Sequence, residues 1–300
     1  MNWKEYEREI HEELLRRYPN VPITKNAKVL GCITLKMRQI DVLIEPQLLD
    51  SPFRIIVDAK FRKHPIDVND VESFISMMHD VKADRGFLIS TAGYTDTAIQ
   101  RAHKEPNQDI ELDVFSLADL KYLQGELAIP YRGKFGVLLD APFGWVVDGQ
   151  QQRGFPACLY QRGLDLNSAG MAKEWMYVNF WAKETPDQSL EDLLKIQAEN
   201  MRREKLDAKL SYHPGVDRQD AKTQIRLAEI PSYPTPEYTG FVEFKDFIFF
   251  SVLFTTPQMA KRNLRKLRDI LRTVKPIYVK QDARLPNPAL PNPPLNSDPA

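Results

Sequence analysis

Two carboxylates and one ammonium group occur within residues 38–60, RQIDVLIEPQLLDSPFRIIVDAK. Asp41 begins one short apolar run, and Asp58 ends another, two residues before Lys60. Because side chains alternate between the faces of a strand, Asp58 and Lys60 point the same way. A hairpin that also brings Asp41 beside them assembles the oxygen ligands that Mg²⁺ prefers, with several waters retained. A lysine there can position or deprotonate a water, or stabilise charge developing at phosphorus.

The elements around these residues must bring the two runs together. Asp50, Ser51 and Pro52 lie between the runs, which predicts two strands joined by a polar turn. Residues 3–18 have the periodicity of a helix, whose apolar stripe comprises Trp3, Tyr6, Ile10 and Leu14. Glu7 lies beside that stripe, so it can reach inward toward the hairpin as a metal ligand or as support for one. The alternative is a partly exposed helix glutamate.

Alternating strand and helix signals continue after the hairpin. Besides the hairpin strand of residues 55–60, strands are expected at residues 29–35, 39–45, 86–90 and 110–115, and helices at 67–79 and 95–103, with a last short helix at 116–123. With the first helix, the order is α-β-β-β-α-β-α-β. That order suits an α/β (α+β) domain in which a mixed sheet is flanked by helices.

The residues that could do chemistry also match a known pattern. Asp41 followed by Asp58-Ala59-Lys60 resembles the PD-(D/E)xK nuclease signature, and two further segments resemble the Mrr-type restriction endonuclease branch. One segment is Tyr6-Glu7 on the first helix. The other is RGFLISTAGYT at residues 85–95, followed by Ala98 and Ala102. The resemblance covers about residues 1–120.

This resemblance implies a restriction-endonuclease-like fold and metal-dependent hydrolysis of DNA. The metal ligands would be Asp41, Asp58, the backbone carbonyl of Ala59 and Glu7, which completes or supports the shell. The metal would be Mg²⁺, with Mn²⁺ as a substitute, and the catalytic residues would be Asp41, Asp58, Lys60 and Glu7. Families of this kind often act in restriction or anti-phage defence, usually as dimers, so a homodimer is expected.

The second half of the chain differs in composition and pattern, because its aromatic residues are dense and its strand signals are of the antiparallel type. Strands, a helix from Ser189, a long hairpin at residues 240–255 and a closing helix at 258–274 predict a second α+β domain with a mainly antiparallel sheet. This layout resembles a PsbP-like α/β sandwich. The expected divisions are 1–125 for the nuclease domain, 126–280 for a recognition or regulatory domain that responds to a protein or ligand activator, and 281–300 for a disordered Pro/Asn-rich tail.

Two basic clusters have alternative interpretations. Residues 61–65 directly follow Lys60 and either hold phosphates or form a solvated loop. The closing helix carries the densest basic run, which either tracks a phosphate backbone or an acidic partner, or forms a solvated face. The members of that run are Lys261, Arg262, Arg265, Lys266, Arg268 and Arg272.

Composition excludes several classes of protein. Lys plus Arg and Asp plus Glu both number 41, so the chain has no net charge that would itself draw it to nucleic acid. Cys32 and Cys158 lack metal-binding spacing, the first residues lack a signal-peptide core, and no apolar run approaches a membrane span. A cytoplasmic protein without membrane contact is therefore expected. Motifs for nucleotide binding, zinc proteolysis and thiol redox chemistry are absent from the sequence.

The leading hypothesis is a Mg²⁺-dependent DNA endonuclease. One alternative is a nuclease fold that only binds or assembles, against which the intact Asp41, Asp58 and Lys60 argue. A second is a structure-specific or RNA-cutting nuclease, because such a metal site does not by itself select the substrate. A third places the functional centre in residues 127–275, as a sensor that switches the nuclease.

Overall fold

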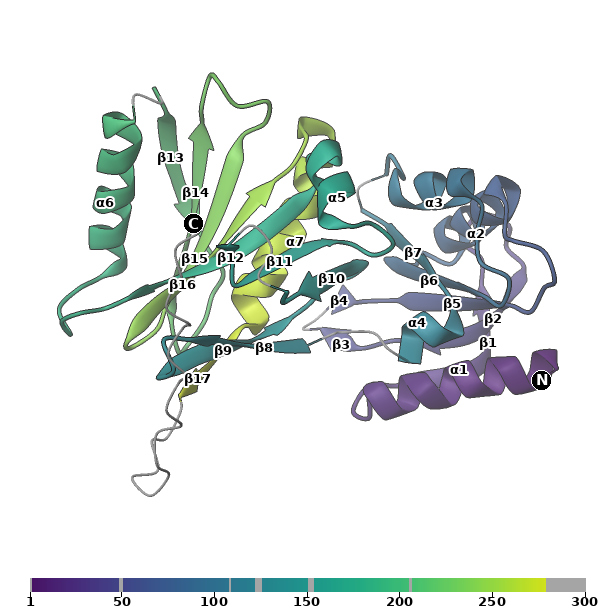
Figure 1. Ribbon diagram of the computed structural model, residues 1–300. Coiled ribbons are helices and arrows are strands. Elements are labelled where there is room, and N and C mark those ends of the chain that lie inside the picture. The colour runs from purple at the N-terminus through teal and green to yellow at the C-terminus, as the bar shows by residue number, and fades with distance from the viewer. Residues whose placement is uncertain are drawn as a thin grey trace, which may run out of the picture.

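The computed structural model describes residues 2–48, 51–107, 109–121, 126–150, 154–204 and 207–278. Two lobes, each built on its own sheet, lie side by side (Figure 1). The N-terminal lobe comprises the described residues up to 121, and the C-terminal lobe those from 126 onward. The expected domain boundary at 125 and the expected tail at 281–300 both lie outside the described residues.

The N-terminal sheet has the strand order β1-β2-β5-β6-β7. The antiparallel strands β1 (Ile23–Leu30), β2 (Met37–Ile44) and β5 (Ile55–Lys60) adjoin the parallel strands β6 (Arg85–Ser90) and β7 (Glu111–Phe115). Short strands β3 (Gln47–Leu48) and β4 (Ser51–Pro52) lie between β2 and β5. The predicted mixed sheet and the pairing of the two runs in residues 38–60 are confirmed.

The first strand lies earlier than the sequence predicts. Residues 31–36 form a turn instead of a strand, because the buried Asp80 carboxylate accepts hydrogen bonds from the backbone N–H groups of Ile33 and Thr34, each at 2.9 Å. The Thr34 hydroxyl donates to the same carboxylate at 2.7 Å. A distant side chain thus determines where β1 ends, which strand propensity alone cannot show.

Helices cover both faces of this sheet (Figure 1). Helices α1 (Trp3–Arg17) and α4 (Leu117–Lys121) cover one face, where Tyr6, Ile10 and Leu14 are buried. Helices α2 (Val68–Asp80) and α3 (Asp96–His103) cover the other. Trp3 is 53% exposed, so the first member of the predicted stripe does not join the core.

The C-terminal lobe is mainly antiparallel, as predicted. Its seven-stranded sheet runs in the order β10 (Trp145–Asp148), β11 (Ala157–Gln161), β12 (Trp175–Ala182), β16 (Phe247–Phe254), β15 (Glu237–Glu243), β14 (Lys222–Glu229) and β13 (Lys209–Pro214). A smaller sheet contains β17 (Lys275–Tyr278), β9 (Phe135–Asp140) and β8 (Glu126–Tyr131). Strands β8, β13 and β17 and the short helix α5 (Leu166–Ala172) were not predicted from the sequence.

Two helices sandwich the large sheet. Helix α7 (Ala260–Thr273), entered through the 3₁₀ turn η2 (Pro257–Met259), buries Leu267 and Leu271 in the main core. Helix α6 (Leu190–Arg203) buries Leu190 and Leu193 against Phe241 and Ile248. Alternation of side chains along β15 and β16 supplies apolar groups to both helices.

The basic run of α7 joins the two lobes. Arg262 is 4% exposed and its guanidinium donates to the backbone carbonyls of His103 at 3.0 Å, Glu105 at 2.5 Å and Asn107 at 3.2 Å, all in the N-terminal lobe. Lys266, also 4% exposed, donates to Glu111 of β7 at 2.5 Å. For Arg262 and Lys266, both the phosphate-tracking and the solvated-face interpretations are wrong, because these cations are buried against the other lobe.

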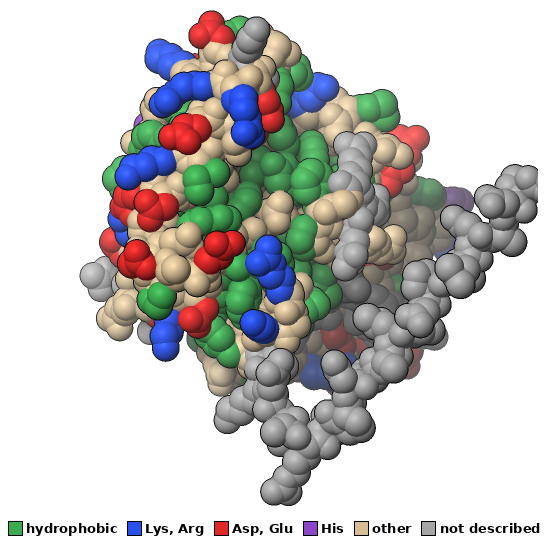
Figure 2. Space-filling model, turned by 60° about the vertical axis from the view of Figure 1, so that its left-hand side comes forward, with side chains coloured by type: hydrophobic (Ala, Val, Ile, Leu, Met, Phe, Trp, Pro, Cys, Tyr) green, Lys and Arg blue, Asp and Glu red, His purple; other side chains and the backbone are tan. Residues whose placement is uncertain are grey.

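The opposite side of the C-terminal lobe mixes charges. Figure 2 shows Lys and Arg side chains interspersed with Asp and Glu around a central group of apolar side chains. The described part of this face therefore gathers no single-sign basic field of the kind that attracts nucleic acid.

None of the helices in the described ranges is both long and apolar enough to span a membrane.

Candidate active site

Strand pairing places Asp41 and Asp58 together at one end of the N-terminal sheet. The β2–β5 ladder pairs Val42 with Val57, so Asp41 and Asp58 occupy the next position along it. The Asp41 Oδ2 atom accepts the N–H of Ala59 at 2.8 Å, which fixes this carboxylate against β5. The sequence-predicted meeting of the two acids therefore occurs in the structure.

The two acids repel each other as anions. Burial raises the pKa of Asp41 to about 6; the Ala59 N–H opposes this shift, and the neighbouring Asp58 and Glu7 carboxylates add to it. A half-buried carboxylate pair of this kind is stabilised when a proton or a cation joins it. The pair is thus arranged to receive positive charge.

Lys60 provides one cation beside the pair. Its Nζ atom lies 2.8 Å from Asp58 Oδ2, and the two side chains are 27% and 14% exposed, respectively. A lysine paired to a carboxylate in this way is held as an ammonium donor whose remaining N–H groups are available to a ligand. Asp58 and Lys60 therefore form an ion pair on β5, as expected from their spacing, and the Asp41 carboxylate lies against the same strand.

Glu7 lies near the pair without joining it in a three-ligand cluster. Its charge contributes to the raised pKa of Asp41. Within the described ranges, no three acidic, histidine or cysteine side chains come close enough to form a metal-binding group. The adjacent Tyr6 is 1% exposed, packs its ring 5.8 Å from that of Phe61, and leaves its hydroxyl without a hydrogen bond to any described group. The role of Glu7 as a ligand remains a prediction.

Tyr94 lies behind the site, and its sequence position within residues 85–95 predicted no role for its hydroxyl. Its hydroxyl hydrogen-bonds to the Leu88 carbonyl of β6 and lies 3.2 Å from the Phe115 carbonyl of β7. Burial raises the pKa of Tyr94, and both Asp58 and Asp113 are close enough to raise it further. The signal available in the sequence was an aromatic hydroxyl directly after the turn at Gly93, beside otherwise apolar strands.

The basic loop after Lys60 divides into two parts. Arg62 pairs with Asp70 of α2 at 2.9 Å, so it anchors the loop to that helix. The hydroxyl of Thr91 donates to the Arg62 carbonyl at 2.8 Å and accepts its N–H at 3.0 Å. Lys63 and His64 are exposed on the same loop. For Lys63 and His64, phosphate binding and a solvated loop both stay open as interpretations.

Comparisons with known proteins match one family model and several solved structures, two of which follow. No curated protein matches the chain. The crystal structure of "Protein of Unknown Function AF1548" aligns at 15% identity over 43% of this chain and 73% of that one, with a TM-score of 0.30. The solution structure of cyanobacterial PsbP (CyanoP) from Synechocystis sp. PCC 6803 aligns at 12% identity over 52% of this chain and 94% of that one, with a TM-score of 0.34.

The family comparison concerns the lobe that carries the acid pair. The family model described as restriction endonuclease (Mrr_cat) matches residues 1–121. The matched residues include α1, the β2–β5 ladder and the strand that carries Lys60. The expected resemblance of residues 1–120 to Mrr-type restriction endonucleases is therefore confirmed by the family model.

Proposed function

We propose that this protein is a Mg²⁺-dependent endonuclease that hydrolyses phosphodiester bonds in DNA at Asp41, Asp58 and Lys60. The observation that carries the proposal is the acid pair on β2 and β5, with an ammonium group 2.8 Å from one member. The restriction endonuclease family of residues 1–121 supports DNA as the substrate and a restriction or anti-phage setting. Assembly as a homodimer, which would allow both strands to be cut, is part of the same proposal.

The residues at the site fit a magnesium ion. Asp41 and Asp58 offer carboxylate oxygens, and burial, with smaller contributions from the Asp58 and Glu7 charges, raises the pKa of Asp41, which favours a bound cation at the pair. Mg²⁺ commonly binds through one or two carboxylates and keeps several waters, so two acids and the Ala59 carbonyl are an adequate donor set. Mn²⁺ prefers similar ligands and is expected to substitute. When bound there, the ion would neutralise the scissile phosphate and acidify a bound water.

The protein's own groups would do the remaining work. The Lys60 ammonium, held by Asp58, would position the attacking water and stabilise charge on the phosphoryl oxygens. Glu7, on α1, would support the site through its charge or as an outer ligand. Exposed Lys63 and His64 would contact the phosphate backbone beside the scissile bond.

A panel of substrates tests the proposal. Purified protein is incubated with Mg²⁺ and supercoiled plasmid, linear duplex, single-stranded DNA or RNA, and Asp58→Asn is compared with the exposed control Asp96→Asn. We expect cleavage of duplex DNA by the wild type and by Asp96→Asn, and its loss in Asp58→Asn. Cleavage of RNA alone would replace DNA as the substrate, whereas equal cleavage by Asp58→Asn would place the active site elsewhere.

A further inference from the structure

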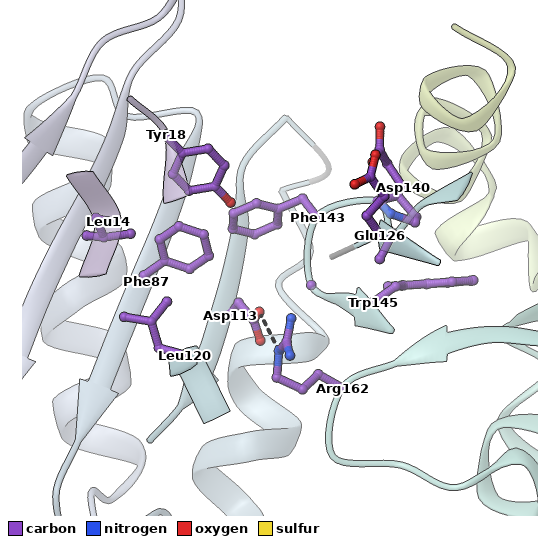
Figure 3. A pocket seen from close by; sticks show the side chains of 13 residues that line it. Leu14, Tyr18, Phe87, Asp113, Leu120, Glu126, Asp140, Phe143, Trp145 and Arg162 are labelled. Atoms are coloured by element: carbon purple, nitrogen blue, oxygen red, sulfur yellow. Dashed lines mark hydrogen bonds and ion pairs between the residues drawn. The ribbon is translucent and has the colours of Figure 1, made fainter. Parts of the chain in front are cut away.

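The side chains of the N-terminal lobe that face the other lobe are covered by it. Figure 3 shows the cavity between the lobes, about 670 Å³ in volume, where Phe87 stacks on Phe143 with 4.9 Å between the ring centroids. Asp113 and Arg162 form an ion pair beside them at 3.1 Å. This contact between the lobes gives no cover to the turn between β1 and β2, whose apolar side chains remain exposed.

Four large apolar side chains project from the β1–β2 turn and form what we call the apolar tip. Leu30 is 60% exposed, Ile33 70%, Leu35 75% and Met37 58%. Single exposed apolar side chains are ordinary, whereas several from one short segment form a patch of the kind that marks an interaction surface. The apolar tip therefore needs an explanation outside the folded chain.

The apolar tip is held in one conformation by the end of α2. The Asp80 carboxylate accepts the N–H groups of Ile33 and Thr34, each at 2.9 Å. The Cys32 N–H donates to the Asp80 carbonyl at 2.7 Å, and the Arg38 guanidinium lies 2.8 Å from the Asp80 carboxylate. These bonds fix the backbone of the turn, so the four side chains are presented to solvent by an ordered scaffold.

Leu35 occupies a conformation that its side chain disfavours. Its φ is 55°, in the left-handed region where Gly or Asn is the usual residue and a larger side chain costs free energy. Because Leu35 is also exposed, burial of its side chain does not offset this cost. A strained and exposed apolar residue on a fixed turn is the kind of outlier that indicates a function.

The charges around the apolar tip all have one sign. Residues 18–40 contain no Asp or Glu, and their basic residues are Lys25, Lys28, Lys36 and Arg38. Lys28 and Lys36 are exposed, whereas Arg38 is paired with Asp80. A second copy of the chain that docked through the same surface would bring these lysines against each other. A polyanion with apolar surface between its charges, such as duplex DNA, complements the apolar tip instead.

The apolar tip lies within reach of DNA at the acid pair. Met37 and Asp41 are both on β2, and a chain of four residues spans at most about 14 Å. Leu35 is two residues further, so it lies at most about 22 Å from Asp41. That separation corresponds to about six base pairs of duplex DNA. A duplex bound at Asp41 therefore passes close to the apolar tip.

We propose that the apolar tip is a wedge that enters the minor groove of duplex DNA. Ile33 and Leu35 insert between neighbouring base pairs, and Lys28 and Lys36 contact the flanking phosphates. Minor-groove proteins insert Leu, Ile and Met in this way and kink the duplex. The inference rests on the proposed nuclease function and deepens it, because it makes the substrate a duplex that is unstacked beside the scissile bond.

Binding of a fluorescent duplex tests the wedge. Duplexes rich in TA steps, which unstack most easily, carry 2-aminopurine, a base whose fluorescence rises when stacking is lost. The full chain carrying Asp58→Asn is the parent protein, so that binding is measured without cleavage. Leu35→Gly and Lys36→Ala are compared in this parent with Met171→Ala and Lys195→Ala, two exposed positions of the C-terminal lobe.

The two tip variants should differ in what they lose. We expect Leu35→Gly to weaken duplex binding by about tenfold and to abolish the rise in 2-aminopurine fluorescence. Lys36→Ala should reduce the slope of log affinity against log salt by about one. Met171→Ala and Lys195→Ala should match the parent in both measurements.

Thermal melting separates this role from a structural one. Gly adopts the left-handed region without steric cost, so Leu35→Gly should melt at or above the temperature of the parent protein. A purely structural role for Leu35 would instead lower the melting temperature together with the affinity, and that result would overturn the proposal.

Further results would also contradict the wedge. If the parent binds duplex DNA and Leu35→Gly keeps its affinity and its fluorescence rise, the wedge is wrong and the proposed nuclease function stands. If Leu35→Gly keeps DNA affinity but dissociates a dimer of the parent in sedimentation velocity, the apolar tip is a contact between copies. Absence of duplex binding by the parent and the wild type would overturn both the wedge and DNA as the substrate.

Discussion

Asp41 on β2 and Asp58 on β5 occupy adjoining positions of one antiparallel ladder, and the Asp41 carboxylate accepts the N–H of Ala59 at 2.8 Å. The same ladder buries Val42 and Val57 in the core beneath α1. The acid pair is therefore positioned by the main-chain hydrogen bonds that build the sheet. Sites built on strands in this way hold their side chains more precisely than sites built on loops.

The acid pair is expected to lower stability. The pKa of Asp41 in the folded protein, about 6, lies above its ordinary value, so ionisation of Asp41 opposes folding. This cost is absent below about pH 4, develops as pH rises from about 4 to about 6, and stays at no more than about 3 kcal/mol above that. At pH 7.5 without metal, Asp41→Asn should therefore melt a few degrees above the wild type.

Mg²⁺ should raise the melting temperature of proteins that keep the acid pair. A cation that binds only the folded acid pair raises the melting temperature of the wild type and of Asp96→Asn, and it leaves Asp41→Asn largely unchanged. An Asp41→Asn protein that melts below the wild type in metal-free buffer would show that the pair is not electrostatically strained.

Arg262 should be a major contributor to stability. Its guanidinium donates to the His103, Glu105 and Asn107 carbonyls, and Arg262→Met would leave these acceptors without their donor. We expect a loss of about 3 kcal/mol in the free energy of unfolding, measured with urea. The neighbouring Lys261 pairs with Asp109 at the surface, with both side chains more than half exposed, so Lys261→Met should change stability by no more than about 0.5 kcal/mol. Equal losses in the two variants would contradict the lobe-joining role of Arg262.

His103 should make the protein less stable in acid. Burial lowers the pKa of His103 to about 4, with smaller contributions from Lys266, Arg262 and Arg162. Between pH 6.5 and about 4 the unfolded chain therefore binds a proton that the folded protein does not. Stability from this group is complete above about pH 6.5 and falls by about 3 kcal/mol as pH drops toward 4.

Unfolding measured across this pH range tests the role of His103. His103→Gln should flatten the pH dependence, and His64→Gln, on an exposed loop, should keep the wild-type slope. An unchanged slope in His103→Gln would show that other groups cause the acid sensitivity.

Lys63 should contribute to DNA binding through phosphate. It is exposed on the loop that Arg62 and Asp70 anchor beside Lys60. Lys63→Ala should weaken binding of duplex DNA regardless of sequence and reduce the slope of log affinity against log salt by about one. Fluorescence anisotropy with the catalytically impaired Asp58→Asn background measures this, and Lys82→Ala serves as the exposed control. A salt slope equal to that of the control would assign the loop to solvent.

The meeting of Asp41 with Asp58 and Lys60 was predictable because its signals are local. An acid at the head of one apolar run, and an acid and a lysine two residues apart at the end of another, required only that the runs pair. The role of Asp80 in ending β1 was not predictable, since its partners Ile33 and Thr34 lie 46 or more residues away in the chain.

The join between the lobes was not predictable for a related reason. A basic run opposite an apolar stripe looks the same whether water or another lobe covers it, so Arg262 and Lys266 gave no signal of burial. For the cavity, one signal was present: Glu111 and Asp113 alternate within an otherwise apolar strand, and both are buried. Buried acids in a strand indicate that partners come from elsewhere in the fold.

Single-turnover cleavage of a labelled DNA duplex, titrated with Mg²⁺, tests the central claim most directly. The wild type is compared with Asp58→Asn and Lys60→Met, and with the exposed-site controls Asp96→Asn and Lys82→Met. We predict Mg²⁺-dependent cleavage by the wild type and both controls, and a loss of at least about a hundredfold in each site variant. Cleavage by Asp58→Asn or Lys60→Met at the wild-type rate would contradict the account.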